Sequence, residues 1–569
     1  MSTASRFRPL LRGVLVAIVA FFVVYLVGAN VVLNTDVLDP VINKKREKSL
    51  IEWESGWTIF PGVIHVEGLR FRGQSLKQQW QFTLAEADVR MNLFALPWKK
   101  VRASRVVGRD FSFRQRPRLS ADAPAEAGAE YFPEIPGLSN PPDPAPEDIY
   151  PPKRKKKRGW NIRISDIDLE GDLEVAVNQL RLAGAGRAGG DFAYQIRGEM
   201  YLPTSYLDLE GSVIQVAGTT FVNEVYLKAD SRLGPFVPKQ TKGIAIFDHL
   251  VGSVALENGT IPDVEVLNTF FTDTSPIRFT DGTASFNWSF DKESTESGSH
   301  GDLSISAEGA DLLMGGRAIS ADLGLEARLE RGSLAEGSWA LGETTLALDK
   351  VDVRLLKSDE EARAAAASPP SPDDLWWMRF TIRKGAVDLG DPTTLSADFR
   401  FRMKNTDPLL HMFLAKPTSS GGAKLPGWAK LLPDVTDIEG RGGFRVDEAG
   451  MHVENVVIDG DEFDLIAVLD GHGGSADGGL FLRYKGHSVG VEVENGRKDL
   501  KILRPKRWFL EQEMFRDEWP IVEALMSGGG RDSEQAEERE KKAEKEEKKK
   551  AKKEKKKKGK GGGDSPGLR

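Results

Sequence analysis

One uncharged run near the N-terminus constrains this chain more than any other feature. Residues 13–35 read GVLVAIVAFFVVYLVGANVVLNT and contain no acidic or basic side chain. A helix rises about 1.5 Å per residue and the hydrocarbon core of a bilayer is about 30 Å thick, so roughly 20 apolar residues span it. Because no later stretch is as long and as apolar, the sequence predicts a single transmembrane helix over 13–35.

The charges before the run indicate its orientation. Three basic residues precede it, Arg6, Arg8 and Arg12. They favour a cytoplasmic segment 1–12 and a translocated body. The alternative is a cleavable signal peptide, with Val27 and Ala29 before the cut. The apolar core of such a peptide is about 7–15 residues long, whereas this run continues to Leu33, which favours an uncleaved anchor. The chain has no cysteine, so it forms no disulfide and carries no lipidated cysteine.

The body has a hydrophobic period of two. Apolar residues occupy alternate positions in runs that include 192–196, 284–290, 319–329, 395–403 and 489–493. Such alternation is typical of strands with one apolar and one polar face. Turn signals separate the runs, at 170–172, 257–259, 280–282 and 494–496. We therefore predict a mostly β fold: a transmembrane helix, then a long antiparallel sheet built as a meander, with few short helices.

Two polar segments and a charged tail divide the body. The predicted parts are a first β segment 36–117, a Pro-rich and basic excursion 118–158, a central β segment 159–356, an Ala/Pro-rich excursion 357–374, a C-terminal β segment 375–527 with a terminal helix, and a Lys/Glu-rich tail 528–569, disordered or helical. Both excursions lack long apolar runs and are expected to be exposed. Short helices are plausible around 408–415 and 510–526.

The sequence carries no convincing catalytic or metal-binding motif. Gly184, Gly186 and Gly189 fit a GxGxxG pattern, but a strand rather than a helix follows, so we interpret them as a hairpin turn. Asp459, Asp461 and Asp464 lack the glycine and distal glutamate of a calcium loop and are expected on the wet face of a strand. The histidines are scattered. We predict no enzyme activity, no cofactor and no metal.

A basic cluster ends the first excursion and consists of Lys153, Arg154, Lys155, Lys156, Lys157 and Arg158. Behind a membrane anchor, a nucleic-acid partner fits poorly. Anionic lipid headgroups or anionic envelope surfaces are the favoured contacts, because each basic residue near such a surface contributes about 1 kcal/mol. A solubilising role without a fixed partner is the alternative.

Five segments give the chain a family resemblance: 56–70, 87–93, 101–108, 160–171 and 380–389. Together with the anchor before them, they resemble the AsmA-like family, which is related to TamB and to bridge-like lipid-transfer proteins. The resemblance implies an anchor in a bacterial inner membrane, a periplasmic body, and a curled sheet whose apolar lining carries phospholipid. It implies a role in envelope maintenance and outer-membrane biogenesis.

The function expected from the sequence is the holding or transfer of phospholipid along an apolar β groove, without covalent chemistry. The candidate lining residues are Phe192, Tyr194, Ile196, Phe286, Trp288, Leu323, Leu325, Phe399 and Phe401. A closed β-sandwich would show the same alternation, so a packed core is the competing interpretation. The alternative function is a structural or assembly factor that docks an envelope protein through its sheet edge or basic tail.

Overall fold

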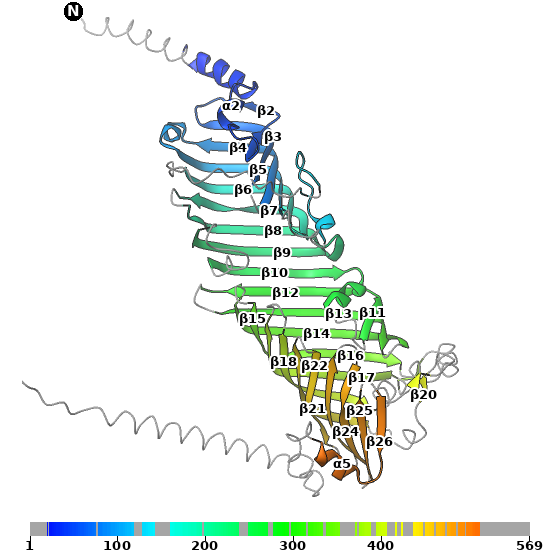
Figure 1. The fold of residues 1–569 in the computed structure, drawn as a ribbon. Helices are drawn as coiled ribbons and strands as arrows, with labels where there is room; N and C mark the ends of the chain where they lie inside the picture. The colour runs from blue at the N-terminus through cyan, green and yellow to red at the C-terminus, as the bar shows by residue number, and fades with distance from the viewer. Residues whose placement is uncertain are drawn as a thin grey trace, which may run out of the picture. The chain divides into compact units, whose positions relative to one another are not determined.

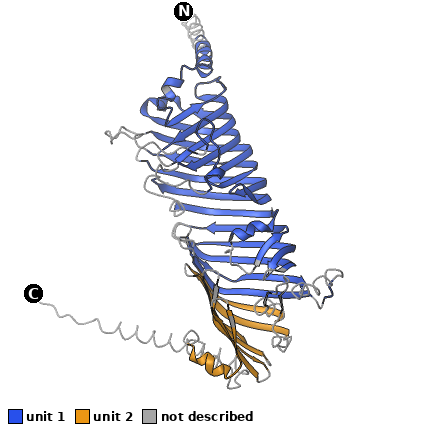
Figure 2. Cartoon of the chain, turned by 45° about the vertical axis from the view of Figure 1, so that its right-hand side comes forward, with its two compact units in different colours: residues 1–394, 408–425 blue, residues 395–407, 426–569 orange. Residues whose placement is uncertain are grey.

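The computed structural model consists of two compact units, formed mostly of β-strands with few short helices (Figures 1 and 2). Unit 1 comprises residues 1–394 and 408–425, and unit 2 comprises 395–407 and 426–569. The structure describes residues 20, 22–75, 78–118, 128–140, 142, 160–195, 198–237, 249–270, 277–294, 298–314, 317–333, 337–352, 370–372, 375–388, 394–406, 416–417, 423–424, 436–447, 450–459, 463–472, 475–484, 487–494 and 497–512.

Unit 1 contains a large curled sheet. Its strands are β1 (Ser49–Glu52), β2 (Ser55–Trp57), β3 (Val63–Gln74), β4 (Gln78–Met91), β5 (Lys100–Pro117), β6 (Asn161–Val177), β7 (Leu180–Tyr194), β8 (Met200–Val216), β9 (Thr219–Phe236), β10 (Leu250–Ile261), β11 (Ile277–Asp281), β12 (Ala284–Lys292), β13 (Ser299–Met314), β14 (Arg317–Ser333), β15 (Ser338–Leu341), β16 (Thr344–Asp352) and β17 (Leu375–Asp388). A separate small pair consists of β19 (Lys416–Pro417) and β20 (Ala423–Lys424).

Helices are short and few in the described part of unit 1. They are α2 (Asp39–Ile42) and the 3-10 helices η1 (Leu93–Trp98), η2 (Ala129–Tyr131) and η4 (Val264–Phe270). Residues 22–33 are also helical, and they form the end of the uncharged run. Among the residues that the structure describes, no helix combines the length and the apolar character needed to cross a membrane. Most of the first half of the run lies outside the described residues.

The strand pairing is antiparallel in the described part of unit 1, with one exception. β5 and β6 pair in parallel, with Val101 opposite Ile162 and Phe113 opposite Val175. A parallel pair needs a long crossover connection, and the excursion that begins at 118 provides it. The expectation of a simple meander was therefore wrong at this point.

Bulges with a left-handed residue interrupt many of the long strands. Residues with positive φ inside strands include Gly68, Asp110, Asp166, Gly171, Gly211, Glu224, Asn258, Gly309 and Lys350. Several coincide with register shifts, as at 256/259, 307/310 and 348/351. A bulge bends its strand and increases the local twist, so repeated bulges curl the sheet. Two of the supposed turn signals, 170–172 and 257–259, are thus bends inside β6 and β10 rather than hairpin turns.

Side chains of neighbouring strands stabilise these bulges. Each accepts a hydrogen bond from a backbone N–H at the bulge: Asp110 Oδ1 from Asp172 at 3.0 Å, Asp191 Oδ1 from Asp166 at 3.0 Å, Asn287 Oδ1 from Asn258 at 2.8 Å and Asp322 Oδ1 from Gly309 at 2.9 Å. An amide that loses its ladder partner would otherwise lack a hydrogen bond. Acidic and amide residues at the bends therefore have a structural role.

Asp322 allows a test of this role. Its other oxygen pairs with Lys350 Nζ at 2.6 Å, and this bond, followed by the backbone bond from Gly309, holds the pKa of the carboxyl below its usual value of 3.8. Asp322→Asn should lower the free energy of unfolding by about 1 kcal/mol at pH 7. A carboxyl whose pKa is lowered by folding stabilises the fold at pH values above its pKa in the unfolded chain. The difference in free energy of unfolding between wild type and variant should therefore shrink as the pH falls below about 4. Urea denaturation at pH 7 and at a pH below about 4 measures this difference. A difference that does not change with pH would contradict the prediction.

Part of the first excursion packs on the sheet rather than lying exposed. Phe132 and Ile135 are buried, and the Arg116 side chain is fully buried beside them. Arg116 donates to Gln79 Oε1 at 2.9 Å and to the carbonyls of Pro133 at 3.1 Å and Ser139 at 2.6 Å. The expectation of an exposed excursion is therefore wrong for 128–140, because a few apolar residues and one arginine suffice to hold it.

Unit 2 contains β18 (Thr394–Asn405), β21 (Thr436–Asp447), β22 (Gly450–Asp459), β23 (Phe463–His472), β24 (Ser475–Tyr484), β25 (His487–Glu494), β26 (Arg497–Lys501) and the helix α5 (Pro505–Glu511). In α5, Phe509 is fully buried against Ile466 and Phe481. The helix α5 begins before the predicted range 510–526, whose residues from 513 lie outside the described ones, as does 408–415.

Asp464 does not lie on the wet face of its strand. It is 3% exposed and pairs with Arg483 at 2.5 Å, so the expectation of a solvated acid is wrong. Asp461 lies outside the described residues. The three glycines of the GxGxxG pattern are also misassigned as a turn, because they lie inside β7. There a Cβ at Gly186 would lie 2.0 Å from the Asp208 carbonyl oxygen of β8.

Candidate functional site

A continuous row of apolar or small residues crosses the sheet of unit 1. Directly paired residues from β2 to β17 form it: Gly56, Val66, Ala87, Gly108, Leu169, Ala188, Leu207, Ala229, Val254, Phe290, Gly301, Leu329, Leu341 and Gly385. We call this the apolar row, and the side of the sheet that bears it the apolar face. Adjacent strands are about 4.8 Å apart, so the row follows the sheet for about 60 Å.

The neighbouring positions form a second row on the opposite face. Its paired residues are Glu67, Glu86, Arg109, Glu170, Arg187, Asp208, Lys228, Ala255, Ser289, Asp302 and Arg328. We call it the charged row. Opposite charges meet along much of it, for example Arg109 with Glu170 at 3.3 Å and Arg328 with Asp302 at 3.1 Å. The two rows show that the sheet segregates apolar from charged residues strand by strand.

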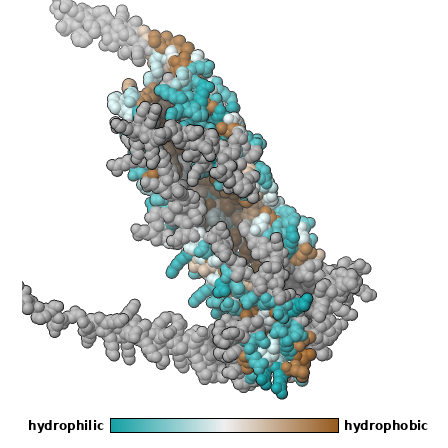
Figure 3. All heavy atoms as spheres, in the orientation of Figure 1, coloured by the Kyte–Doolittle hydropathy of each residue, from teal (hydrophilic) through white to brown (hydrophobic). Residues whose placement is uncertain are grey.

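The apolar face lies on the inside of the curl. The rings of Phe290 (β12) and Trp339 (β15) both belong to it, and their centroids are 6.1 Å apart. β13 and β14 separate these strands in the pairing order, and three strand spacings of a flat sheet would be about 14 Å. Brown, hydrophobic atoms are visible in a hollow of unit 1 (Figure 3).

Many side chains of the apolar face are only half-buried. Leu182 and Ile214 are intermediate in exposure, and Leu180 and Val216 near the strand ends are 49% and 45% exposed. A face packed against a second sheet would have buried these residues completely. The arrangement can therefore hold an apolar ligand along the strands.

Four predicted lining residues lie together on the apolar face of unit 1. Ile305 pairs with both Phe286 and Leu325, so these two flank it in one row. Trp288 and Leu323 belong to the rows on either side. Phe286 and Leu323 are buried, whereas Trp288 and Leu325 are half-buried.

The other predicted lining residues are more scattered. Phe192 and Tyr194 lie on the apolar face of β7, opposite Ile164 and Ile162, and Ile196 lies outside the described residues. Phe399 and Phe401 belong to unit 2, where their rings cover Gly442 and Gly440 of β21. The basic cluster, Lys153, Arg154, Lys155, Lys156, Lys157 and Arg158, lies outside the described residues.

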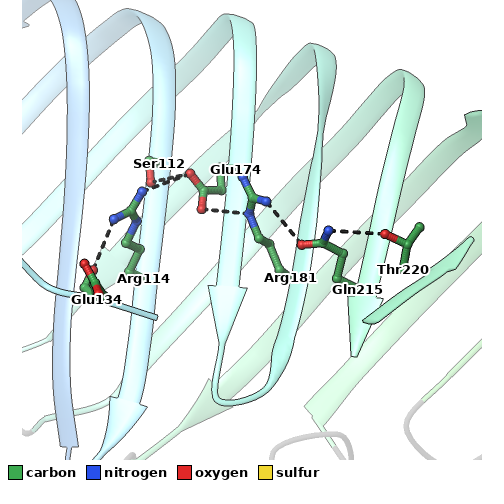
Figure 4. A network of polar contacts seen from close by, with 7 residues as sticks. All are labelled: Ser112, Arg114, Glu134, Glu174, Arg181, Gln215 and Thr220. Carbon is green, nitrogen blue, oxygen red and sulfur yellow. Dashed lines mark hydrogen bonds and ion pairs between the residues drawn. The ribbon is translucent and has the colours of Figure 1, made fainter. Parts of the chain in front are cut away.

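A polar network crosses five strands on the charged face. It joins Ser112, Arg114, Glu134, Glu174, Arg181, Gln215 and Thr220 (Figure 4). Glu174 accepts from Arg114 at 3.2 Å and from Arg181 at 3.2 Å. Side chains that satisfy one another in this way bridge β5 to β9, and we interpret the network as structural.

The described residues contain no cluster of acidic or histidine side chains arranged to hold a metal ion. A shallow depression of about 670 Å³ has a mixed lining that includes Asn287, Asp302 and Arg328. Its lining also contains Ser289 and Ser304 beside acidic residues, and no histidine. The apolar face therefore remains the candidate site.

Comparison with known proteins adds no further assignment. No protein-family model, no curated protein and no solved structure matches the chain.

Most of the apolar row was not predicted from the sequence. Leu207, Ala229 and Val254 were not singled out, because bulges shift the alternation within β8, β9 and β10. A usable signal was present: a charged residue directly follows or precedes each member in most strands, as in Leu207-Asp208 and Lys228-Ala229.

Proposed function

We propose that this chain is a membrane-anchored protein that holds or transfers phospholipid along the apolar face of unit 1. The observation that carries the proposal is the apolar row, which continues over fourteen strands without a charged or polar member. Acyl chains would lie on this face, and the headgroup would remain in water at its rim. The driving force is the removal of apolar surface from water.

The anchor in this proposal is the uncharged run 13–35, with a cytoplasmic N-terminus. The resemblance to the AsmA-like family supports a bacterial inner membrane for the anchor, a periplasmic location for the body, and a role in envelope maintenance. The half-buried state of the apolar face supports a bound ligand over a permanently packed core.

Mass spectrometry of lipids retained by the purified full chain tests the proposal. The chain is extracted in detergent, and the detergent is exchanged repeatedly for one with a short acyl chain. We expect at least one phospholipid per chain to remain. A folded chain without lipid would contradict the proposal, and a protein retained in a fixed ratio instead would favour a docking factor.

A further inference from the structure

One edge of unit 1 gathers nearly all exposed aromatic side chains of the described residues. The described residues include six exposed aromatic side chains: Trp57, Phe60, Phe94, Trp98, Tyr131 and Trp160. All except Tyr131 lie at the same ends of β2 to β6, and Phe94 and Trp98 of η1 are 84% and 64% exposed. Exposed aromatic clusters of this kind mark interaction surfaces.

Backbone contacts show that these segments are neighbours. Gly62, in the turn between β2 and β3, accepts a hydrogen bond from Met91 N at the end of β4. Asn161 N, at the start of β6, donates to the carbonyl of Lys99, next to η1. We call the segments 57–63 and 93–99 with Trp160 the aromatic edge.

The helix over 22–33 is fixed to this edge by side-chain hydrogen bonds. Asn30 bonds both backbone groups of Thr58, donating to its carbonyl at 2.9 Å and accepting from its N–H at 2.9 Å. Asn34 Nδ2 donates to the Gly56 carbonyl at 2.6 Å. The rings of Phe22 and Phe60 have centroids 5.9 Å apart. The aromatic edge is therefore attached directly to the uncharged run.

Arginines stand in like-charge pairs beside the aromatic edge. Arg90 lies directly opposite Arg105, and Arg102 directly opposite Arg163, and all four are exposed. Only Arg105 has an acidic partner among the described residues, Asp166 at 3.3 Å. Like charges directly across a strand pair destabilise a sheet unless another group neutralises them. The pairs thus indicate an anionic partner at this position.

We propose that the aromatic edge and these arginines dock on the surface of an anionic phospholipid bilayer. Aromatic side chains are favoured at the level of the headgroups, and basic residues are attracted to anionic lipid. The same uncharged run that would anchor the chain continues from this edge, so the bilayer is already adjacent. The inference rests on the membrane anchor of the proposed function. It places the first strands of the apolar face at the bilayer surface, where a lipid could enter.

Spin labelling tests the docking, because the chain has no cysteine of its own. The full chain is reconstituted into vesicles of phosphatidylglycerol and phosphatidylethanolamine, with a nitroxide on Phe94→Cys or on Ser306→Cys. Ser306 is exposed on β13 and serves as the control. We expect oxygen to relax the label at 94 more strongly than a water-soluble nickel chelate, and the reverse at 306.

A double variant tests the arginines. Arg102→Gln with Arg163→Gln should lower the ratio of docked to undocked label at position 94 roughly fivefold per residue in anionic vesicles, the factor that about 1 kcal/mol implies. It should have no effect in neutral vesicles. A label at 94 that is as water-exposed as the label at 306 would overturn the inference. In that case, a chain that stays in the vesicles after a wash with alkaline carbonate would still support the membrane anchor, and hence the proposed function.

Discussion

Ala229→Glu should abolish phospholipid retention without unfolding the protein. Ala229 lies in the apolar row between Leu207 and Val254 and is half-buried. A charged side chain in contact with acyl chains costs about 2.5 kcal/mol or more, so we expect lipid bound per chain to fall at least tenfold. Mass spectrometry of retained lipid measures the loss, and circular dichroism shows whether the strands persist.

Ala255→Glu is the matched control for this prediction. Ala255 is also half-buried and lies only one strand away, but it belongs to the charged row beside Lys228. The same substitution there places a carboxylate opposite a lysine, so lipid retention should equal that of the wild type. Equal losses in the two variants would contradict the assignment of the apolar face. If Ala229→Glu unfolds the chain, Ala229→Gln with the same readout still separates the two faces.

Arg116→Ala should release the segment 128–140 from the sheet. The guanidinium is fully buried and donates to Gln79 and to the backbone carbonyls of Pro133 and Ser139. Its loss leaves these acceptors without their donor and opens a cavity, at a cost of about 3 kcal/mol. We expect amide hydrogen exchange within 128–140 to accelerate about 100-fold.

Arg70→Ala provides the comparison for Arg116. Arg70 pairs with Glu54 at 3.0 Å, but both side chains are more than half exposed. An exposed pair contributes about 0.5 kcal/mol, so exchange should change little anywhere. Unchanged exchange in Arg116→Ala would show that the apolar contacts of Phe132 and Ile135 alone hold the segment.

The mostly β fold could be predicted from the sequence, because alternation over long runs is a strong signal. The curl was expected only from the family resemblance, and its mechanism, repeated bulges, could not be predicted from the alternation. Glu257-Asn258-Gly259 has the composition of a tight turn, yet it forms a bulge inside β10, since Asn258 adopts positive φ there and Asn287 of the next strand supplies the hydrogen bond. Composition indicates the local backbone conformation and does not tell whether the chain reverses.

The candidate site was predictable only in part. Phe286 and Leu325 were selected because aromatic and branched residues stand out in an alternating run. Ala229 and Gly108 were not, because small residues carry no signal until pairing places them in a row with larger ones. The arginine pairs beside the aromatic edge depend in the same way on register. Arg102 and Arg163 are far apart in sequence and become neighbours only through the parallel pairing of β5 and β6.

Photo-crosslinking in living cells tests the central claim most directly. A benzophenone amino acid replaces Leu207 in the apolar row or Lys228 in the charged row of the full chain, and mass spectrometry identifies the adducts after irradiation. We expect phospholipid adducts at position 207 and none at 228. Adducts at 207 to the chain itself or to another protein, with no lipid, would contradict the claim that the apolar face binds lipid.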